Sequence, residues 1–532
     1  MNRPSPSFSL RSLVFAVLCS SLPGSLAGAA EFDLIIRNGR LLDGTGNPWV
    51  YADVGIKGDR IVAVGRIVAD DNAREIDAAG HYVTPGFIDV HSHAWPAISR
   101  PKTASAEALL TQGITTVFIN PDGGGPIDLS MQRRAIEAVE PGLNVARFIG
   151  HNSTRSAVLG RQNRDPDPSE LARMAGIVRQ GFEAGAFGLS AGPFYVPGNF
   201  SKTEEHIALA RIAAEFDAVY TSHIRDESDY TIGVVAAVEE VIRVAREARV
   251  PGVVTHIKAL GPPVWGKSAE IVQRVEAARE EGVQVFADQY PYEASSTGLT
   301  AALVPAWAQA GGAGALNARL LEPEIRASIR REMAGNLARR GGAANIMISE
   351  FAPDPSLERR RLDAIARDRL REPIDVAIEI VLAGGATIIS FNMSDEDVRR
   401  LMVQPWTMTS SDGKLVEPGE GNTHPRSYGP FPRKLRRYVL EAKVLTLEQA
   451  IRSMTGLPAA VFRLRDRGYV RVGAYADLVV FDPAAIADLA TYEEPHQLST
   501  GVRYVVVNGV LALSSGQITK ARAGRVLNRQ AQ

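Results

Sequence analysis

The middle of the sequence alternates short apolar stretches with amphipathic helical patterns, and this alternation is the strongest constraint on the fold. Helical patterns such as Val234–Ala248 and Ser268–Glu281 separate several of the apolar stretches. Eight stretches have the length and character of buried strands: residues 84–90, 115–120, 144–150, 186–190, 218–223, 252–257, 283–289 and 407–411. Repeated strand–helix units form a parallel sheet. About eight of them predict an α/β fold with a (β/α)8 TIM-like barrel.

The two ends of the chain have a different pattern. Short strand-like runs separated by turn signals fill residues 31–84, and similar runs return in Ala476–Phe481 and Val502–Gly509. We therefore expect a small β-sandwich domain formed from both chain ends, residues 31–84 plus 466–525. The barrel domain is expected over residues 85–465. An insertion at about residues 300–345 interrupts the strand spacing.

The first thirty residues differ from the rest of the chain. Two arginines precede the apolar run Leu13–Leu18, and small residues follow in Ala27–Ala30. The run is far shorter than the ~20 residues that span a bilayer. Residues 1–30 are therefore interpreted as a secretory signal peptide, with a retained membrane anchor as the alternative. We expect an exported protein, periplasmic or secreted, with no stable membrane insertion after signal cleavage.

Composition limits the class of partner. The chain has 59 Lys+Arg against 60 Asp+Glu and a formal net charge of −1, so it lacks the basic excess of a nucleic-acid-binding protein. The single cysteine, Cys19, lies in the predicted signal peptide, which leaves the mature chain without a thiol ligand or a disulfide. A small-molecule substrate is expected, and a homo-oligomer remains open.

Histidines stand at the ends of several predicted strands. His91 and His93 end one strand, and residues two apart on a strand point to the same side. His223 and His256 end two further strands, and Asp412 follows a fourth. Because the carboxyl ends of parallel barrel strands share one face, four imidazoles and a carboxylate should meet there. This pattern predicts a zinc or di-zinc hydrolytic site.

Two motifs point to other chemistry. Gly188–Gly192 matches the G-x-S-x-G pattern of serine hydrolases, but the prolines that follow cannot begin the helix that a nucleophile elbow requires. Gly261–Ser268 matches the phosphate-loop pattern between a strand and a helix. Here Val264 and Trp265 are bulky where small residues should let the backbone wrap a phosphate. A P-loop NTPase remains an alternative from another class.

Six motifs together carry a family resemblance. They are Phe32–Gly39, Gly86–His93, Gly113–Val117, Ser222–Glu227, Asp288–Tyr292, and His424–Arg426 leading to Gly429–Arg433. On these motifs the chain resembles the N-acyl-D-amino-acid deacylases (D-aminoacylases) of the amidohydrolase superfamily. The resemblance runs from about residue 32 to residue 481. It implies a distorted TIM barrel with a small β-sandwich. It also implies zinc-dependent cleavage of the amide bond of N-acyl amino acids, with N-acyl-D-amino acids as the expected substrates.

The resemblance also implies residue roles. Metal would be bound by His91 and His93 at one position and by His223 and His256 at the other, with one or two Zn²⁺ per chain. Asp412 would be the general acid/base and a metal ligand. The side chains expected to bind a substrate with a free carboxylate are Lys258, Tyr290, Ser296, Arg426 and Tyr195. His151, which ends another predicted strand, is a further substrate-binding candidate.

One position departs from the family pattern. The family has a metal-bridging cysteine after the second strand, and this sequence has Asp122 there, within Asn120–Gly123. A carboxylate can also bridge two zinc ions, so Asp122 is included among the expected metal ligands.

Several alternative functions stay open. Within the enzymes they are a dipeptidase for D-residue-containing dipeptides and a cyclic-amide hydrolase of the hydantoinase or dihydroorotase type. The latter enzymes use a carboxylated lysine as the metal bridge, and no lysine at the end of an apolar strand fits that role. Outside the hydrolases, a non-catalytic periplasmic binding protein remains, besides the NTPase.

Overall fold

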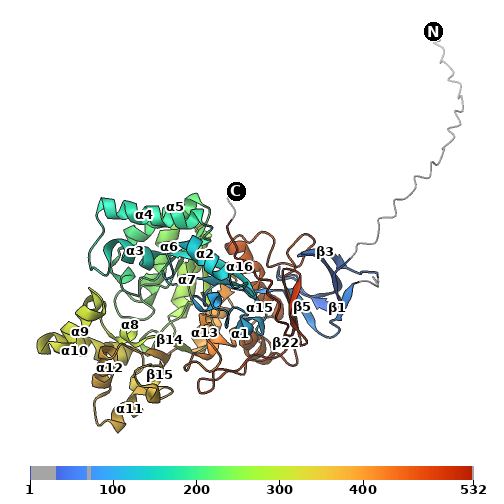
Figure 1. The fold of residues 1–532 in the computed structure, drawn as a ribbon. Helices are drawn as coiled ribbons and strands as arrows, with labels where there is room; N and C mark the ends of the chain where they lie inside the picture. The colour runs from blue at the N-terminus through green and yellow to red at the C-terminus, as the bar shows by residue number, and fades with distance from the viewer. Residues whose placement is uncertain (2–31, 69–72, 530–532) are drawn as a thin grey trace.

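The computed structural model describes Met1 and residues 32–68 and 73–529, so the predicted signal peptide, apart from Met1, lies outside the described residues. Figure 1 shows a central barrel with a sheet built from both chain ends on one side and a helical insert on the other. No helix of the described ranges is long and apolar enough to cross a membrane.

Eight parallel strands form the barrel, and their order in the sheet follows their order in the chain. They are β6 (Phe87–Asp89), β8 (Ile114–Ile119), β9 (Asn144–Gly150), β10 (Gly188–Ala191), β11 (Val219–Ser222), β12 (Gly252–Val254), β13 (Val285–Gln289) and β17 (Thr407–Thr409). Two short strands, β7 (Ser92–His93) and β18 (Gly413–Lys414), pair in parallel and connect β6 to β17. The prediction of a TIM-like barrel is confirmed.

Helices cover the outside of the barrel. They are α1 (Glu107–Leu110), α2 (Leu129–Glu137), α3 (His151–Leu159), α4 (Pro168–Glu183), α5 (Thr203–Glu215), α6 (Val234–Ala248), α7 (Ser268–Glu280), α13 (Asp395–Met402), α14 (Pro430–Arg433), α15 (Leu447–Met454) and α16 (Gly456–Val461), with a π-helix at Lys434–Glu441. In α6, the buried residues Val234, Val238, Val241 and Ala245 recur every three or four positions and form one apolar face. Such apolar faces pack against the barrel strands.

Strands from both chain ends form one nine-stranded sheet. Its members are β1 (Leu34–Leu41), β2 (Val50–Lys57), β3 (Arg60–Gly65), β4 (Arg74–Asp77), β5 (Tyr82–Pro85), β19 (Leu478–Phe481), β20 (Val502–Val507), β21 (Val510–Ser514) and β22 (Gln517–Ile518). The antiparallel pair β5–β19 joins the two halves. Leu478 packs with Val54 in the core of this sheet, and its neighbour Val479 packs with the barrel side. The alternation of side chains along a strand therefore attaches the sheet to the barrel.

A large insert separates β13 from β17. Its antiparallel sheet consists of β14 (Ala294–Gly298), β15 (Ile346–Glu350) and β16 (Thr387–Phe391). Its helices are α8 (Leu299–Leu303), α9 (Ala313–Leu321), α10 (Pro323–Arg339), α11 (Leu362–Asp368) and α12 (Pro373–Leu382), and they share a hydrophobic core of their own. The insert extends beyond the predicted residues 300–345 on both sides.

Candidate metal centre

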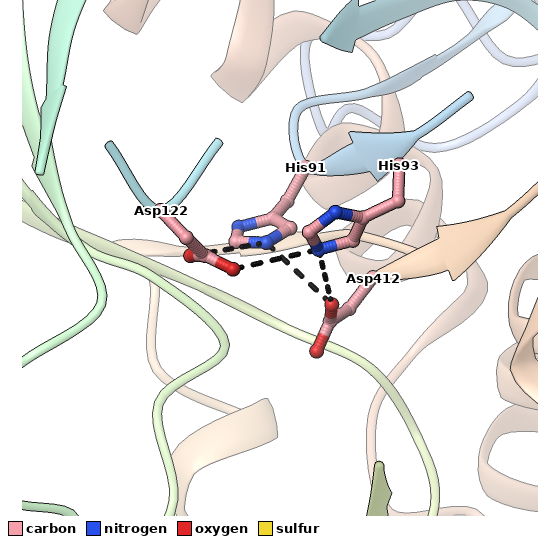
Figure 2. A group of neighbouring side chains, drawn as sticks. All are labelled: His91, His93, Asp122 and Asp412. Carbon is pink, nitrogen blue, oxygen red and sulfur yellow. Dashed lines mark ion pairs between the residues drawn. The ribbon is translucent and has the colours of Figure 1, made fainter. Parts of the chain in front are cut away.

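The carboxyl ends of the barrel strands bring histidines and aspartates together (Figure 2). His91 and His93 follow β6, Asp122 follows β8, and Asp412 follows β17. His93 Nε2 lies 3.1 Å from Asp412 Oδ1 and 3.4 Å from Asp122 Oδ2. His91 Nε2 lies 3.6 Å from Asp412 Oδ1 and 3.5 Å from Asp122 Oδ1. These four side chains can surround one cation.

Asp122 also belongs to a second group, with His223 and His256. Its Oδ1 lies 3.7 Å from His223 Nδ1 and 3.5 Å from His256 Nε2. One carboxylate therefore faces all four imidazoles. The structure brings together every residue that the sequence predicted as a metal ligand.

Three of these residues and Asn120 hold a backbone conformation that favours glycine. The φ angles are 65° at Asn120, 56° at Asp122, 34° at His256 and 48° at Asp412. A non-glycine residue in such a conformation costs about 1–3 kcal/mol and persists where its surroundings enforce it. At Asp122 the enforcement comes from Ser190, whose Oγ donates to the Asn120 carbonyl at 2.7 Å and accepts from Gly123 N at 3.2 Å. The serine of the G-x-S-x-G motif thus fixes the loop that carries Asp122.

Two carboxylates behind the histidines orient their rings. Glu227 pairs with Lys258 and lies 3.1 Å from His256 Nδ1 and 3.7 Å from His223 Nε2. Asp288 accepts from His256 N at 2.9 Å and lies 4.0 Å from His91 Nδ1. Such outer carboxylates fix ring orientation in metal sites. Sequence reasoning missed both as site residues, although each lies in a motif that carried the family resemblance.

The electrostatics of the centre keep its aspartates ionised. Burial would raise the pKa of Asp122, but the imidazoles of His91, His223 and His256 around it hold that pKa well below its usual value. Burial likewise opposes ionisation of Asp412, and Arg426, 2.8 Å away, outweighs it and keeps the pKa of Asp412 well below its usual range. The centre therefore offers anionic oxygens together with imidazoles.

Several polar atoms of the centre are buried without a hydrogen-bond partner among the described residues. They include both ring nitrogens of His91 and of His223, and Oδ1 of Asp122. Buried polar atoms in proteins almost always have a partner. Imidazole nitrogens and carboxylate oxygens are the ligands that zinc takes in catalytic sites. The donor set and its unpartnered atoms fit a bound metal ion.

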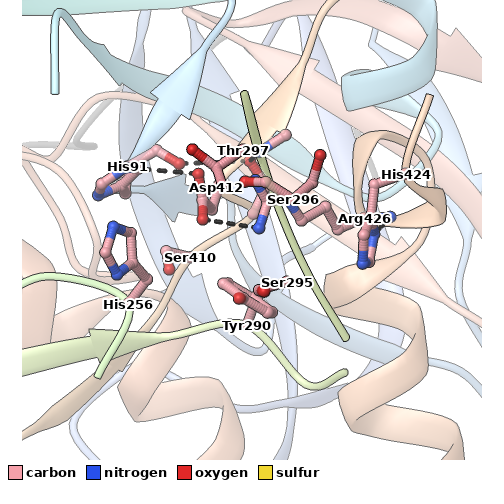
Figure 3. A network of polar contacts seen from close by, with 12 residues as sticks. His91, His256, Tyr290, Ser295, Ser296, Thr297, Ser410, Asp412, His424 and Arg426 are labelled. Carbon is pink, nitrogen blue, oxygen red and sulfur yellow. Dashed lines mark hydrogen bonds and ion pairs between the residues drawn. The ribbon is translucent and has the colours of Figure 1, made fainter. Parts of the chain in front are cut away.

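The centre lies in the wall of a cavity of about 370 Å³. The predicted substrate-binding residues Tyr195, Lys258, Tyr290, Ser296 and Arg426 all line this cavity. The ring centroid of Tyr290 lies 5.5 Å from Lys258 Nζ and 4.8 Å from the Arg426 guanidinium carbon. Figure 3 shows Arg426 and Tyr290 beside Asp412, with the β14 strand of the insert alongside. The barrel thus supplies the metal centre, and the insert supplies part of the cavity wall.

The structure does not bring His151 to this cavity. His151 begins helix α3, so its side chain lies in the helix layer, where its Nε2 pairs with Glu205 at 2.8 Å. Glu205 also pairs with Arg155. His151 is absent from the cavity lining that contains the other candidates. We therefore correct the prediction that His151 binds substrate: this histidine lies in the helix layer, where its contacts are structural.

The phosphate-loop motif also has a structural explanation. The carboxylate of Asp397, on α13, accepts from Gly266 N at 2.9 Å and pairs with Ser268 Oγ at the start of α7. A buried carboxylate thus occupies the end of the helix at which a P-loop binds phosphate. Lys267 instead lies at the surface and pairs with Glu270 at 3.0 Å. The P-loop hypothesis is wrong for this segment.

Comparison with known sequences assigns the chain to a family. Residues 74–512 match the sequence model of the amidohydrolase family. The chain is 36% identical to N-acyl-D-glutamate deacylase of Alcaligenes xylosoxydans xylosoxydans, over 94% of this chain and 97% of that protein. It is 34% identical to D-aminoacylase of the same organism, over 95% of this chain and 100% of that protein.

Solved structures agree. An N-acyl-D-glutamate deacylase from Bordetella bronchiseptica, in complex with zinc and a phosphonate inhibitor, matches with a TM-score of 0.78 and 34% identity, over 94% of this chain and 100% of that one. A D-aminoacylase structure, from work on its binuclear metal centre, matches with a TM-score of 0.80 and 35% identity over the same shares. Fold and site define a metal-dependent hydrolase. The chain belongs to the amidohydrolase family, and the sequence-based resemblance to the D-aminoacylases is confirmed.

Proposed function

We propose that this chain is a zinc-dependent deacylase of N-acyl-D-amino acids. The observation that carries the proposal is one cavity that holds both the His/Asp centre and a cluster of groups suited to a carboxylate. The relatives named above support the D-configuration and zinc. Their similarity extends over nearly the whole chain, so the comparison includes the cavity wall as well as the centre.

In this proposal, the metal positions are formed by two histidine pairs that share Asp122. One position has His91 and His93, and the other has His223 and His256. Asp412 lies against the first position. Zinc bound there would supply Lewis acidity, which makes water a better nucleophile near neutral pH and polarises an amide carbonyl. One or two ions per chain are compatible with this arrangement.

The substrate carboxylate would bind between Arg426, Tyr290, Lys258 and Ser296. An arginine can bind a carboxylate through two parallel hydrogen bonds. Arg426 Nη1 lies 2.8 Å from Asp412 Oδ2, so a substrate held by Arg426 has its amide close to Asp412. Tyr195, whose hydroxyl lies 3.2 Å from Thr297 Oγ1 of the insert strand β14, would form the wall next to that strand.

Asp412 would act as the general acid/base. Its carboxylate is ionised and lies between the histidines and Arg426, so it can accept a proton from the attacking water. The same carboxyl group would then deliver that proton to the leaving nitrogen. The products are a carboxylic acid and a free D-amino acid.

Substrate panels separate this proposal from its alternatives. Metal-free protein, prepared with a chelator, would be assayed with and without zinc on N-acetyl-D- and N-acetyl-L-amino acids, dipeptides containing a D-residue, and hydantoins. Zinc-dependent release of D-amino acids is expected, with Asp412→Asn as the inactive control. Hydrolysis of only dipeptides would favour the dipeptidase, and hydrolysis of only hydantoins the cyclic-amide hydrolase. If the zinc-loaded protein hydrolyses none of these substrates, or if its activity does not depend on zinc, the proposal is refuted.

Export is proposed on the sequence alone. Residues 1–30 would be removed as a signal peptide, and the mature protein would function in the periplasm or outside the cell. The mass of the protein recovered from a periplasmic fraction should then correspond to a chain that begins near residue 31. A full-length chain recovered from the cytosol would contradict export.

The domain boundaries are also proposals: residues 31–84 plus 466–525 for the β-sandwich domain and residues 85–465 for the barrel.

A further inference from the structure

One cationic side chain of the cavity wall has no counter-ion. Arg340 follows helix α10 of the insert, is 1% exposed, and lines the cavity. Its Nη1 donates to Ser390 Oγ at 3.1 Å, and its Nε has no hydrogen-bond partner among the described residues. Among the described residues, Arg340 forms no ion pair. A buried charge without a partner is costly, by several kcal/mol.

The other lysines and arginines of the wall are all paired. Lys258 pairs with Glu227, Arg426 lies 2.8 Å from Asp412, and Lys414 lies 2.8 Å from Glu350. Arg340 shares no partner with Arg426: its polar contact is Ser390 on β16, whereas Arg426 contacts Asp412 and Ser296. The two arginines therefore form separate anchors in one cavity.

Arg340 has a buried tyrosine beside it that does not itself line the cavity. Its guanidinium carbon lies 5.9 Å from the ring centroid of Tyr230, whose hydroxyl is buried without a partner among the described residues. Burial raises the pKa of Tyr230, so this hydroxyl stays protonated at neutral pH and can donate. The guanidinium of Arg340 suits a carboxylate, and the neutral phenol beside it offers no counter-charge.

The backbone beside Arg340 is fixed to the barrel. Gly261, with φ of 97°, packs so closely that a side chain there would lie 2.1 Å from the Arg339 carbonyl oxygen. Gly261 N also donates to the Asn392 carbonyl of the insert at 2.7 Å. This packing holds the end of α10 against the loop that follows β12. Arg340 is thus held in place before any ligand binds, which lowers the entropic cost of binding.

We propose that Arg340 binds a second carboxylate of the substrate and makes the enzyme selective for dicarboxylic N-acyl amino acids. This inference rests on the proposed deacylase function. The first carboxylate would bind at Arg426, and the second at Arg340. The second carboxylate can belong to the amino-acid side chain, as in N-acetyl-D-glutamate, or to the acyl group, as in N-succinyl-D-leucine. Both present the same chemistry to the guanidinium.

The test compares substrates that differ in charge but not in shape. For zinc-loaded wild-type protein, kcat/KM for N-acetyl-D-glutamate should exceed that for N-acetyl-D-glutamine at least about 30-fold, because breaking a buried charge pair costs 2–5 kcal/mol. The ratio of kcat/KM for N-succinyl-D-leucine to that for N-acetyl-D-leucine tests in the same way whether the acyl group carries the second carboxylate. At least one of the two ratios should be large.

Variants assign the ratio to Arg340. In Arg340→Gln the large ratio should fall to about 1–3, while kcat/KM for N-acetyl-D-leucine changes less than about threefold. Lys414→Met, which removes a paired cation of the same wall, is the matched control and should keep the wild-type ratio. Arg340→Lys keeps the positive charge but loses the two parallel N–H donors, so its ratio should lie between those of the wild type and Arg340→Gln. Circular dichroism and thermal melting check the fold of each variant.

The outcomes separate the inference from the function on which it rests. If no N-acyl-D-amino acid is hydrolysed, the proposed function fails. If N-acetyl-D-leucine is hydrolysed but both wild-type ratios are near one, the function stands and the inference is overturned. An equal ratio in wild type and Arg340→Gln also overturns it. If Arg340→Gln does not fold, the two wild-type ratios decide. The melting temperature of the wild-type protein is then also measured with added D-glutamate, succinate or D-glutamine: the first or second compound should raise it and D-glutamine should not.

Discussion

Replacing Asp122 by asparagine is the sharpest test of the metal centre. Asp122 is the one residue that both candidate ligand groups contain, and its two oxygens lie 3.4–3.7 Å from the imidazole nitrogens of all four histidines. Asparagine keeps the size of the side chain and tolerates the left-handed backbone at this position. The substitution therefore removes the anionic charge and changes little else.

The expected loss follows from its position. Removing a residue that only orients a metal ligand costs about 10–100-fold in metal affinity. Asp122 faces both metal positions directly, so its loss should weaken zinc binding by at least about 100-fold. At a free zinc concentration above both dissociation constants, a 100-fold weaker affinity removes about 2.7 kcal/mol of zinc-dependent stabilisation. The melting temperature should therefore rise much less on addition of zinc than it does in the wild type.

The assay compares each protein with itself, with and without zinc. The metal-free variant also loses the pairing between the carboxylate and the imidazoles, so only the zinc-dependent difference reports on ligation. Asp128→Asn is the matched control: Asp128 lies in the same connection and caps α2 through Met131 N at 2.9 Å. Asparagine caps a helix as well as aspartate does. If zinc stabilises Asp122→Asn as much as it stabilises the control, the carboxylate is not a ligand.

Three further predictions concern other groups. Asp412→Asn should lower kcat about 10²–10⁴-fold with unchanged fold, and a near-normal kcat in zinc-loaded variant would exclude the general acid/base role. Glu227→Gln should weaken zinc binding about 10–100-fold, measured by competition with a chelator, because Glu227 orients the His256 ring from 3.1 Å; unchanged affinity would contradict that role. Burial lowers the pKa of Lys434 to about 7, so the folded state binds fewer protons than the unfolded state from about pH 7 to pH 10. The free energy of unfolding, measured by urea titration, should therefore rise with pH across this window by roughly 1 kcal/mol per pH unit, and Lys434→Met should abolish this rise. An equal dependence on pH in wild type and variant would refute the prediction.

The barrel could be predicted because its strands are buried on both faces. Such strands are continuous apolar runs, and β9 was predicted with the bounds that the structure has, Asn144–Gly150. The ends of strands were less predictable. The run 252–257 reads as one strand, but β12 ends at Val254, because His256 leaves the sheet with φ of 34°. That turn aims the imidazole at the centre, and apolar periodicity carries no signal for it.

Sequence patterns could not separate His151 from His223. Both histidines follow an apolar strand, so the same argument applied to both. The structure differs in what comes next: helix α3 begins at His151, whereas a loop follows β11 and carries Glu227 back to the centre. A glutamate on an irregular loop has no fixed spacing from its partner. Its role therefore depends on the tertiary structure and not on a local pattern.

The extent of the insert was hidden for a related reason. Helix α12 followed by strand β16 repeats the amphipathic and apolar patterns of a barrel unit, yet β16 pairs antiparallel with β14 and β15 instead of joining the barrel. Local patterns specify an element, and only pairing assigns it to a sheet. Residues 346–391 therefore belong to the insert despite their barrel-like pattern.

The division of the cavity between barrel and insert has a consequence for specificity. Zinc-binding candidates come from barrel strand ends, whereas Ser296 and Arg340 come from the insert. If the proposed function holds, substitutions in the insert should change which N-acyl amino acid is bound without disturbing the metal centre. The relatives are consistent with this separation: N-acyl-D-glutamate deacylase and N-acyl-D-aspartate deacylase are 36% and 31% identical to this chain over 94% of its length, yet differ in substrate. Exchanging insert residues should alter KM among substrates, and exchanging barrel ligands should alter zinc content and kcat.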